Sequence, residues 1–521
     1  MDFMHNKIFQ LTAKSLGYEF SHGRKLFSNI SLALHSEKIG LVGANGVGKS
    51  ILAKILAGQI EPTEGDLLCD HRVLYFAQTD DPPLHSAAEY LMDLWESAPQ
   101  GPEVWLPLIE GIDLEKPCAV LSGGEWTRLR LARIVAQSQG LLILDEPTNN
   151  LDQESRAFIS EFVKSYQGAL LLISHDRDLL NQMDAIWELS IQGLTQYGGN
   201  FAFYQEARTA EAHRYEEQLE RSRKEVKKMN RLQSEKIARQ EKRMRHGQQI
   251  ADKGGAPKIL LGTLKRKAQE TQGKIHSHEN QRVERSREEF QNLRLQGKTE
   301  TDLRISFRQP RVPEGKFIFE AKNLNLYLTS EKRLLWESPL NLTMKGPKRW
   351  ALSGPNGAGK SSFVRALLGK TFETLSVQGE LRKGEIHIAH LDQNYTLLNA
   401  QESVLENVLA STQQDLVSVR NSLADFQFLK DQVHQKVGIL SGGEKLKAAL
   451  AKVFLSDPIP HLIILDEPTN NLDLRSLQVL EGALKSYEGA LLVISHDEVF
   501  LENIGIEEVH FLKRGPPTTK T

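Results

Sequence analysis

The sequence GANGVGKS, from Gly43 to Ser50, decides the fold of this chain, and a near copy, GPNGAGKS, runs from Gly354 to Ser361. In each copy the glycines let backbone N–H groups converge on a phosphate, and the helix that follows points its N-terminus at the same anion. Each copy comes directly after a strand-like run, KIGLVG or KRWALSG. A strand, a glycine-rich loop and a helix therefore predict a phosphate-binding α/β unit that is present twice.

Three further motifs follow each loop in the same order, and the second set lies about 320 residues after the first. The first set is LSGGE (Leu121–Glu125), LLILDEP (Leu141–Pro147) and ISHD (Ile173–Asp176), and the second is LSGGE (Leu440–Glu444), IILDEP (Ile463–Pro468) and ISHD (Ile494–Asp497). The runs Leu141–Leu144 and Leu462–Leu465 are short, continuous and apolar, as expected of parallel strands buried on both faces. We therefore predict an α/β fold with a parallel sheet in each half of the chain.

Each half carries the residue types that ATP hydrolysis needs. A lysine neutralises the β- and γ-phosphates, a serine hydroxyl and an aspartate hold Mg²⁺, a glutamate orients the attacking water, and a histidine after a buried strand contacts the γ-phosphate. These residues are Lys49, Ser50, Asp145, Glu146 and His175 in the first half and Lys360, Ser361, Asp466, Glu467 and His496 in the second. The remaining loop residues expected to bind ATP are Gly43, Asn45, Gly46, Gly48, Gly354, Asn356, Gly357 and Gly359. Because both sets are intact, we expect both halves to hydrolyse ATP, with Glu146, Glu467, His175 and His496 as the catalytic candidates.

The chain divides into three segments by composition. We expect a first ATPase domain over residues 1–205 (lobe one), a helical linker over residues 206–312, and a second ATPase domain over residues 313–521 (lobe two). The linker is rich in Glu, Lys, Arg and Gln, which are good helix formers. Its sparse apolar residues are partly periodic and predict a thin seam between two long antiparallel helices: Leu219, Val226, Met229, Val283, Phe290 and Leu293. Glycines and a proline at residues 253–257 predict the turn between them, and the first helix would have about 40 residues.

The linker is strongly basic. Between Arg221 and Lys267 there are 16 Lys and Arg against 4 Asp and Glu, whereas the whole chain has a net charge of −2. Such a segment attracts a polyanion that the rest of the chain repels, which favours nucleic-acid contact over an inert spacer. From charge and position alone, the candidate RNA-contacting residues are Arg239, Lys242, Arg243, Arg245, Lys253, Lys258, Lys265, Arg266 and Lys267.

The remaining composition predicts a soluble, cytoplasmic protein. No run approaches the ~18 apolar residues that a membrane span needs, and the N-terminus has no signal-peptide pattern. The two cysteines, Cys69 and Cys118, match no disulfide or metal framework, as expected in a reducing compartment.

The LSGGE motif resembles the signature of the ATP-binding cassette superfamily, and the resemblance covers both lobes. It implies two P-loop cassettes that face each other head to tail within one monomer, so that each signature loop closes over the nucleotide held by the opposite lobe. Ser441, Gly442 and Gly443 would then complete the site of Lys49 (site one), and Ser122, Gly123 and Gly124 would complete the site of Lys360 (site two). The resemblance also implies that Gln78 and Gln393 are Q-loop residues at the ATP and Mg²⁺, and that the two NNLD segments, ending at Asp152 and Asp473, are D-loops.

Tandem cassettes, a basic helical linker and no membrane segment resemble the ABC-F family. The wording LSGGEWTRLRLA in lobe one is similar to that family's signature. The resemblance implies an ATPase that binds the ribosome in its ATP state and acts through the linker on tRNA or rRNA near the peptidyl transferase centre, either as a housekeeping translation factor or in antibiotic protection. Three alternatives stay open: a DNA-binding repair ATPase, the energising subunit of a transporter, and an assembly scaffold whose linker is only a spacer.

Overall fold

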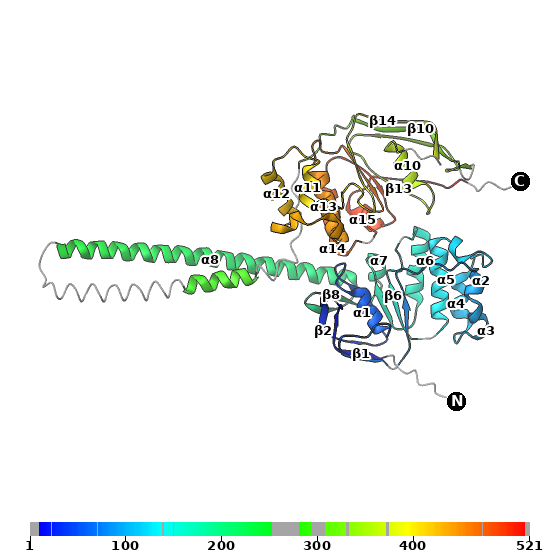
Figure 1. Cartoon of the computed structure of the whole chain (residues 1–521), viewed down its shortest axis with the longest axis horizontal. Helices are drawn as coiled ribbons and strands as arrows, with labels where there is room; N and C mark the ends of the chain where they lie inside the picture. Colours follow the sequence, from blue (N-terminus) through cyan, green and yellow to red (C-terminus); the bar gives the residue numbers. More distant parts are fainter. Residues whose placement is uncertain are drawn as a thin grey trace. The chain divides into compact units, whose positions relative to one another are not determined.

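The computed structural model describes residues 10–21, 23–69, 71–137, 140–149, 151–252, 281–293, 308–329, 333–370, 375–470 and 472–515. By internal contacts the chain forms two compact units: Met1–Tyr204 with Leu303–Thr521, which holds both lobes, and Gln205–Asp302. Each lobe of the first unit has a mostly parallel sheet, and the loops that hold the repeated motifs follow the carboxyl ends of its strands. Each lobe also has a smaller antiparallel sheet (Figure 1).

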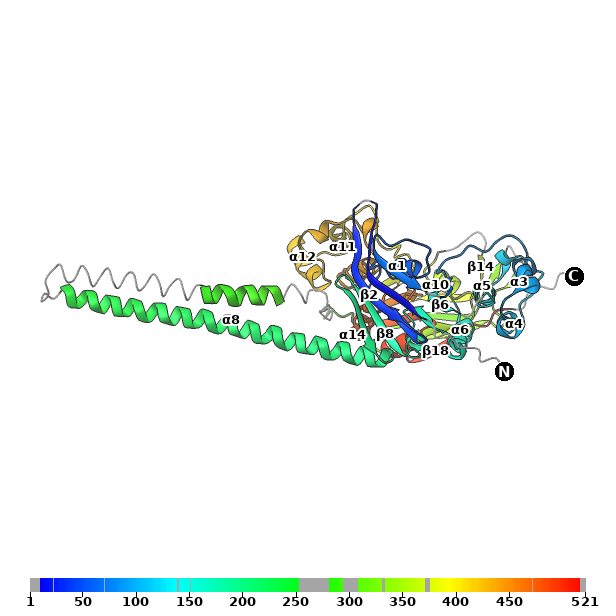
Figure 2. The same ribbon diagram turned by 90° about the horizontal axis from the view of Figure 1, so that it is seen from below.

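Lobe one contains two sheets. The larger has the order β5-β6-β7-β3-β8-β9, parallel except for the final β8–β9 pair, and the smaller has the order β2-β1-β4, with β1 and β2 running side by side as long blue strands in Figure 2. The strands are β1 (Leu11–Glu19), β2 (Lys25–Leu34), β3 (Lys38–Val42), β4 (Glu64–Cys69), β5 (Val73–Phe76), β6 (Leu141–Asp145), β7 (Leu170–Ile173), β8 (Ala185–Ser190) and β9 (Gly193–Gly198). The helices are α1 (Lys49–Leu56), α2 (Ala87–Tyr90), α3 (Met92–Ser97), α4 (Pro102–Ile109), α5 (Gly123–Val135), α6 (Gln153–Ser165) and α7 (Arg177–Leu180).

Lobe two repeats this arrangement. Its parallel sheet has the order β15-β16-β17-β13-β18, and in its antiparallel sheet β10 pairs with β11, β12 and β14. The strands are β10 (Phe317–Leu328), β11 (Arg333–Leu334), β12 (Leu340–Lys345), β13 (Arg349–Ser353), β14 (Leu375–Lys383), β15 (Ile388–Leu391), β16 (Leu462–Asp466), β17 (Ala490–Ile494) and β18 (Glu508–Phe511). The helices are α10 (Lys360–Leu367), α11 (Val404–Leu409), α12 (Leu416–Asp425), α13 (Gly442–Phe454), α14 (Leu474–Ser486) and α15 (Glu498–Asn503).

The predicted α/β fold is confirmed, because the central strands of each parallel sheet are buried on both faces. Every residue of β6 and β7 is buried, and β6 pairs in parallel with both β5 and β7. In lobe two β16 lies between β15 and β17 in the same way. The loops after β3, β6 and β7 therefore leave the sheet at one edge, and this edge holds the repeated motifs.

Glycine is required where β3 turns into the loop that precedes α1. Gly43 has φ +151°, and a Cβ there would lie 2.3 Å from the carbonyl oxygen of Leu189 on the neighbouring strand β8. Gly354 repeats this in lobe two, with φ +145° and the carbonyl oxygen of Leu512 at 2.5 Å. The loop thus approaches the backbone more closely than any other residue type allows.

The second unit is an antiparallel pair of helices. The helix α8 (Phe201–Asp252) pairs with a helix over residues 281–293, and both appear in green in Figure 1. The Tyr215 hydroxyl donates to the carbonyl of Leu293, and Arg287 donates to the side chain of Asn230 at 3.2 Å. The predicted seam lies between these helices: Val283 is 4% exposed, and Leu219, Val226, Met229, Phe290 and Leu293 are partly buried. The predicted turn at residues 253–257 lies outside the described residues.

The helix α8 is longer than the predicted 40 residues, and five of its residues lie before the predicted start of the linker at residue 206. It has 52 residues and starts at Phe201, where the Asn200 side chain accepts a hydrogen bond from the backbone N–H of Phe203 at 3.1 Å. This is the capping interaction of a helix N-terminus. Phe201 is buried in the lobe-one core, so the first turn of α8 belongs to lobe one by packing. None of the helices that the structure describes combines the length with the apolar character that crossing a bilayer requires.

Candidate functional site: two ATP sites

The repeated motifs of lobe one surround a cavity of about 390 Å³. Its lining brings together the P-loop, the end of β6 and the residues that follow β7. Nine lining residues are predicted site residues: Asn45, Gly46, Gly48, Lys49, Ser50, Gln78, Asp145, Glu146 and His175. Asn149, from the NNLD segment, also lines the cavity. Phe20 and Leu26 provide an apolar wall. The cavity has the mixed lining that a nucleotide needs, with an aromatic residue on one side and charged groups at the other.

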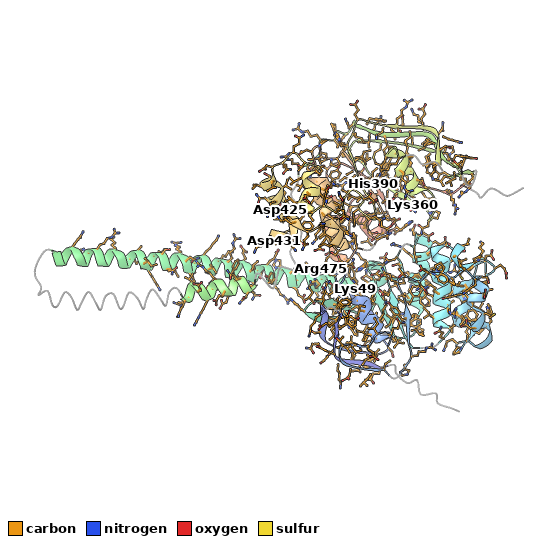
Figure 3. All side chains as sticks on the ribbon, in the orientation of Figure 1. Lys49, Lys360, His390, Asp425, Asp431 and Arg475 are labelled. Carbon is orange, nitrogen blue, oxygen red and sulfur yellow. The ribbon has the colours of Figure 1, made fainter. Side chains whose placement is uncertain are left out.

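The P-loop lysines lie over their own loops. Lys49 is 8% exposed, and its Nζ donates to the carbonyls of Gly43 at 2.7 Å and Ala44 at 3.2 Å. Lys360 has equivalent contacts with Gly354 at 2.7 Å and Pro355 at 3.3 Å, and both lysines are labelled in Figure 3. Burial lowers the pKa of each lysine, while the nearby glutamate of the same lobe raises it. Each ammonium is therefore a desolvated cation beside a carboxylate, and such a cation interacts strongly with a phosphate.

A serine and an aspartate meet at the base of each site. In site one the Ser50 hydroxyl and the Tyr75 hydroxyl, the latter at 2.9 Å, both hydrogen-bond Asp145. Burial raises the pKa of Asp145, and these two hydrogen bonds oppose the shift. Its Oδ1 is buried with no hydrogen-bond partner among the described residues. In site two the Ser361 hydroxyl lies 3.1 Å from Oδ1 of Asp466. A hydroxyl beside a partly unpaired buried carboxylate is an oxygen-rich environment that fits Mg²⁺.

A glutamate and a histidine face each other in each site. Oε1 of Glu146 lies 3.1 Å from Nε2 of His175, and Oε1 of Glu467 lies 3.4 Å from Nε2 of His496. Both glutamates have positive φ, +50° and +48°, which is uncommon for a non-glycine residue and is typical of functional positions. Burial raises the pKa of Glu146 to about 8 and that of Glu467 to about 7. Burial also lowers the pKa of His175 to about 3 and of His496 to about 4, so both imidazoles are neutral near pH 7.

The D-loops connect each site with the opposite lobe. Asp473, which caps α14, accepts a hydrogen bond from the backbone N–H of Asn45 at 2.8 Å, and Asp152, which caps α6, accepts one from the backbone of Asn356. Three side-chain contacts also join the lobes: Arg177 with Glu481, Gln153 with Glu498 at 2.6 Å, and Arg475 with Glu188 at 3.0 Å. Each P-loop is therefore held by a carboxylate of the other lobe, as the head-to-tail arrangement requires.

The structure does not bring the signature loops into the site-one cavity. Over the described residues, its lining comes from lobe one alone. Ser122 and Ser441 are exposed and cap α5 and α13, where each accepts from the backbone of Glu125 or Glu444. Gly123 and Gly442 are also exposed. Their predicted contact with ATP across the lobes stays a prediction, as does that of Gln393, which is exposed after β15.

Comparison with known proteins agrees with this geometry. The family model described as "ABC transporter" matches residues 27–149 and 338–470, one match in each lobe. The probable ATP-binding protein YheS of Escherichia coli (strain K12) is 31% identical over 526 aligned residues, which cover 92% of this chain and 75% of YheS. The chain belongs to the ABC-F type of tandem ATP-binding cassette ATPases. Its two cassettes bind and hydrolyse ATP.

Other relatives of this ABC-F ATPase align over almost the whole chain. The uncharacterized ABC transporter ATP-binding protein YfmM of Bacillus subtilis is 28% identical, covering 95% of this chain and 97% of YfmM. The ATP-binding protein Uup of Haemophilus influenzae is 29% identical, covering 95% and 78%. Among solved structures, the archaeal ribosome recycling factor aABCE1 in complex with the stalk protein aP1 has a TM-score of 0.59 at 17% identity, covering 96% of this chain and 88% of that one. The structural similarity shows a shared tandem-cassette fold.

Sequence patterns missed three residues at the lobe-one site of this ABC-F ATPase. Tyr75 reaches Asp145 from the neighbouring strand, and no motif marks it. Phe20 lines the cavity, and its ring is in edge contact with that of Tyr18, with centroids 5.5 Å apart. Arg130 of α5 fixes the segment before the Q-loop, since it donates to the carbonyl of Ala77 at 2.7 Å and stacks on Phe76. Its position in α5, nine residues from the start of the LSGGE motif, could have drawn attention to it.

Proposed function

We propose that this ATPase is a translation factor that binds the ribosome when its lobes hold ATP and acts on tRNA or rRNA near the peptidyl transferase centre through the linker, residues 206–312. The observation that carries this is the helical pair of the linker with its excess of basic residues. In the described part of the linker Arg239, Lys242 and Arg245 are exposed on α8, whereas Arg243 lies in the helix with its side chain outside the described set. Lys253, Lys258, Lys265, Arg266 and Lys267 lie outside the described residues.

The linker's chemistry supports an RNA partner. Phosphate contacts from lysine and arginine give affinity without sequence preference, and affinity of this kind falls steeply with salt. The two helices share only a thin apolar seam, so most of their surface is free to face a polyanion. Among the similar folds, one solved structure is described as a model of ribosome-bound archaeal Pelota and ABCE1, with a TM-score of 0.53 and 18% identity. Ribosome binding by that protein is consistent with the proposed partner.

The residues of the two sites have distinct roles in this mechanism. Lys49 and Lys360 bind the β- and γ-phosphates, and the D-loop carboxylates Asp152 and Asp473 hold the opposite P-loops while the lobes close. Glu146 and Glu467 orient the attacking water against the γ-phosphate, each beside a neutral histidine. Hydrolysis opens the lobes and releases the protein from the ribosome. ATP binding thus sets when the linker acts.

Mg²⁺ would be held by the hydroxyl and carboxylate at the base of each site. These ligands are Ser50 and Asp145 in site one and Ser361 and Asp466 in site two, with Gln78 and Gln393 completing the set. The ion would neutralise charge on the β- and γ-phosphates. In site one Gln78 lines the same cavity as Ser50 and Asp145, which supports the assignment there.

The test is co-sedimentation of the Glu146→Gln/Glu467→Gln protein with purified ribosomes, with and without ATP. Both substitutions keep the side chain's size and remove the carboxylate, so ATP binds but hydrolysis stops. We expect binding that requires ATP and weakens as salt rises. A matched variant with Arg239, Lys242 and Arg245 changed to Gln should close its lobes on ATP and bind ribosomes more weakly. If the trapped protein sediments alone in ATP, the ribosome is not its partner, and branched DNA or membrane fractions should then be tested in the same way.

A further inference from the structure

The two ATP sites are built on equivalent scaffolds at the lobe interface. Helix α6 begins after Asp152, and helix α14 begins after Asp473. Each capping carboxylate accepts from the P-loop backbone of the opposite lobe, at Asn356 and Asn45 respectively. The first turn of each helix therefore lies against the ATP site of the other lobe.

The two lobes have different residues at the position one turn into these helices. The residue four positions after the cap lies on the same helix face as the cap itself. In α6 this residue is Arg156, and in α14 it is Leu477. Leu477 is 2% exposed and packs in the lobe-two core, whereas Arg156 is partly buried, with its Nε donating to the carbonyl of Leu151 at 3.2 Å. Site two therefore receives a cation from this position of the opposite lobe, whereas the equivalent residue opposite site one is apolar.

The charge of Arg156 acts across the interface on the catalytic pair of site two. Nε2 of His496 lies 3.1 Å from Nζ of Lys360 and 3.4 Å from Oε1 of Glu467. Burial, then Lys360 and Arg156, lower the pKa of His496. Arg156 and His496 also line one cavity of about 210 Å³ between α6 and the start of α15. Arg156 thus shares a cavity with His496, the side chain that contacts both the P-loop lysine and the candidate catalytic glutamate of site two.

We propose that Arg156, supplied in trans by lobe one, stabilises the terminal phosphate of ATP in site two, and that the two sites turn over at different rates because site one has Leu477 in its place. The guanidinium is a permanent cation with several donors, which suits an anion whose charge shifts during phosphoryl transfer. Arginines supplied in trans accelerate such transfers in other nucleotide hydrolases, in some cases by about 10³-fold or more. Site two would therefore depend on lobe pairing for its rate as well as for its closure.

The test measures turnover one site at a time, without ribosomes, so its result does not depend on the translation role proposed above. In the Glu146→Gln protein only site two hydrolyses ATP, and in the Glu467→Gln protein only site one does. Arg156→Leu, which installs the residue found at the equivalent place in lobe two, should lower turnover at least tenfold in the first background. It should change turnover less than twofold in the second. Lys164→Leu, an exposed position near the far end of the same helix, should change neither.

A second measurement separates a phosphate contact from a disturbance of the helix. In the Glu146→Gln background, Arg156→Leu should weaken binding of a non-hydrolysable ATP analogue at site two, while ADP affinity stays within twofold. Arg156→Lys, which keeps the charge, should recover part of the lost turnover. Equal losses of turnover in both backgrounds, or equal losses of ATP-analogue and ADP affinity, would overturn the proposal.

Discussion

The ion pair between Arg177 and Glu481 offers a quantitative test of how the lobes hold together. The Nη2 of Arg177 donates to Oε2 of Glu481 at 3.1 Å, and the second pair of atoms, Nη1 and Oε1, lies 3.0 Å apart. The two side chains are only 9% and 12% exposed, so solvent screens their interaction weakly. Removing one partner of such a pair leaves a buried charge and costs ~3–5 kcal/mol.

Because the two residues come from different lobes, this cost falls on lobe pairing rather than on the folding of either lobe. We expect Arg177→Ala and Glu481→Ala each to raise the ATP concentration that half-saturates hydrolysis by roughly 100-fold to 4,000-fold, since every 1.4 kcal/mol is tenfold in an equilibrium constant. The double variant should lose less than the sum of the two, because neither charge is then left unpaired. The charge-reversed pair, Arg177→Glu with Glu481→Arg, should recover part of the loss.

The assay is the ATP dependence of hydrolysis for the four proteins of this cycle, with the thermal midpoint of each as a folding control. Glu498→Gln is the matched control, because Glu498 occupies in lobe two the position that Arg177 occupies in lobe one, and its carboxylate accepts a hydrogen bond from the amide of Gln153 at 2.6 Å. We expect a change of less than threefold there. Single variants that change half-saturation less than threefold, or a double variant that shows the full sum, would refute a pairing role for this contact.

Three further outcomes follow from local geometry. Gly43→Ala should abolish nucleotide binding at site one, because an added Cβ would lie 2.3 Å from a strand carbonyl at φ +151°; fluorescent-nucleotide titration checks this. Tyr75→Phe removes the hydrogen bond to Asp145 and should slow site one roughly tenfold, in line with ~1.5–3 kcal/mol for a hydrogen bond to a charged group, when measured in the Glu467→Gln protein. Val283→Asp places a charge in the helix seam, where Val283 is 4% exposed; hydrogen exchange in the paired part of α8 should rise while ATPase activity stays unchanged.

The elements that build each site can be predicted from the sequence because they are encoded locally. The P-loop needs glycines at set intervals, and β6 and β16 need unbroken apolar runs, so both leave patterns that can be read directly. Helix α8 was placed too late because its start depends on one capping residue, Asn200, followed by an aromatic residue that belongs to the lobe-one core. Composition places residues 201–205 in lobe one, where Phe201 packs, but it does not reveal that the helix already begins there.

Contacts between distant segments left no pattern in the sequence. Tyr18 and Phe20 are both aromatic and lie two residues apart near the end of β1, but the register of β1 against β2 shifts on both sides of Tyr18. Such irregularities redirect side chains, so alternation does not tell which ring lines the cavity. Arg177 and Glu481 are 304 positions apart in the sequence, and their side chains meet because the two lobes pair.

The two lobes have different residues at equivalent contact positions, and this difference affects which lobes can pair with each other. Arg177 and Glu498 follow ISHD at equivalent positions, and Glu481 and Ser160 lie eight residues after their D-loop aspartates. Two copies of lobe two would set Glu498 against Glu481, a repulsion of like charges, and two copies of lobe one would set Arg177 against Ser160 with no countercharge. In the pairing of lobe one with lobe two, Arg177 instead contacts Glu481, and Glu498 contacts the amide of Gln153. These differences between the lobes favour pairing with the partner lobe on the same chain over pairing with a second copy of either lobe, which keeps one linker per closed clamp.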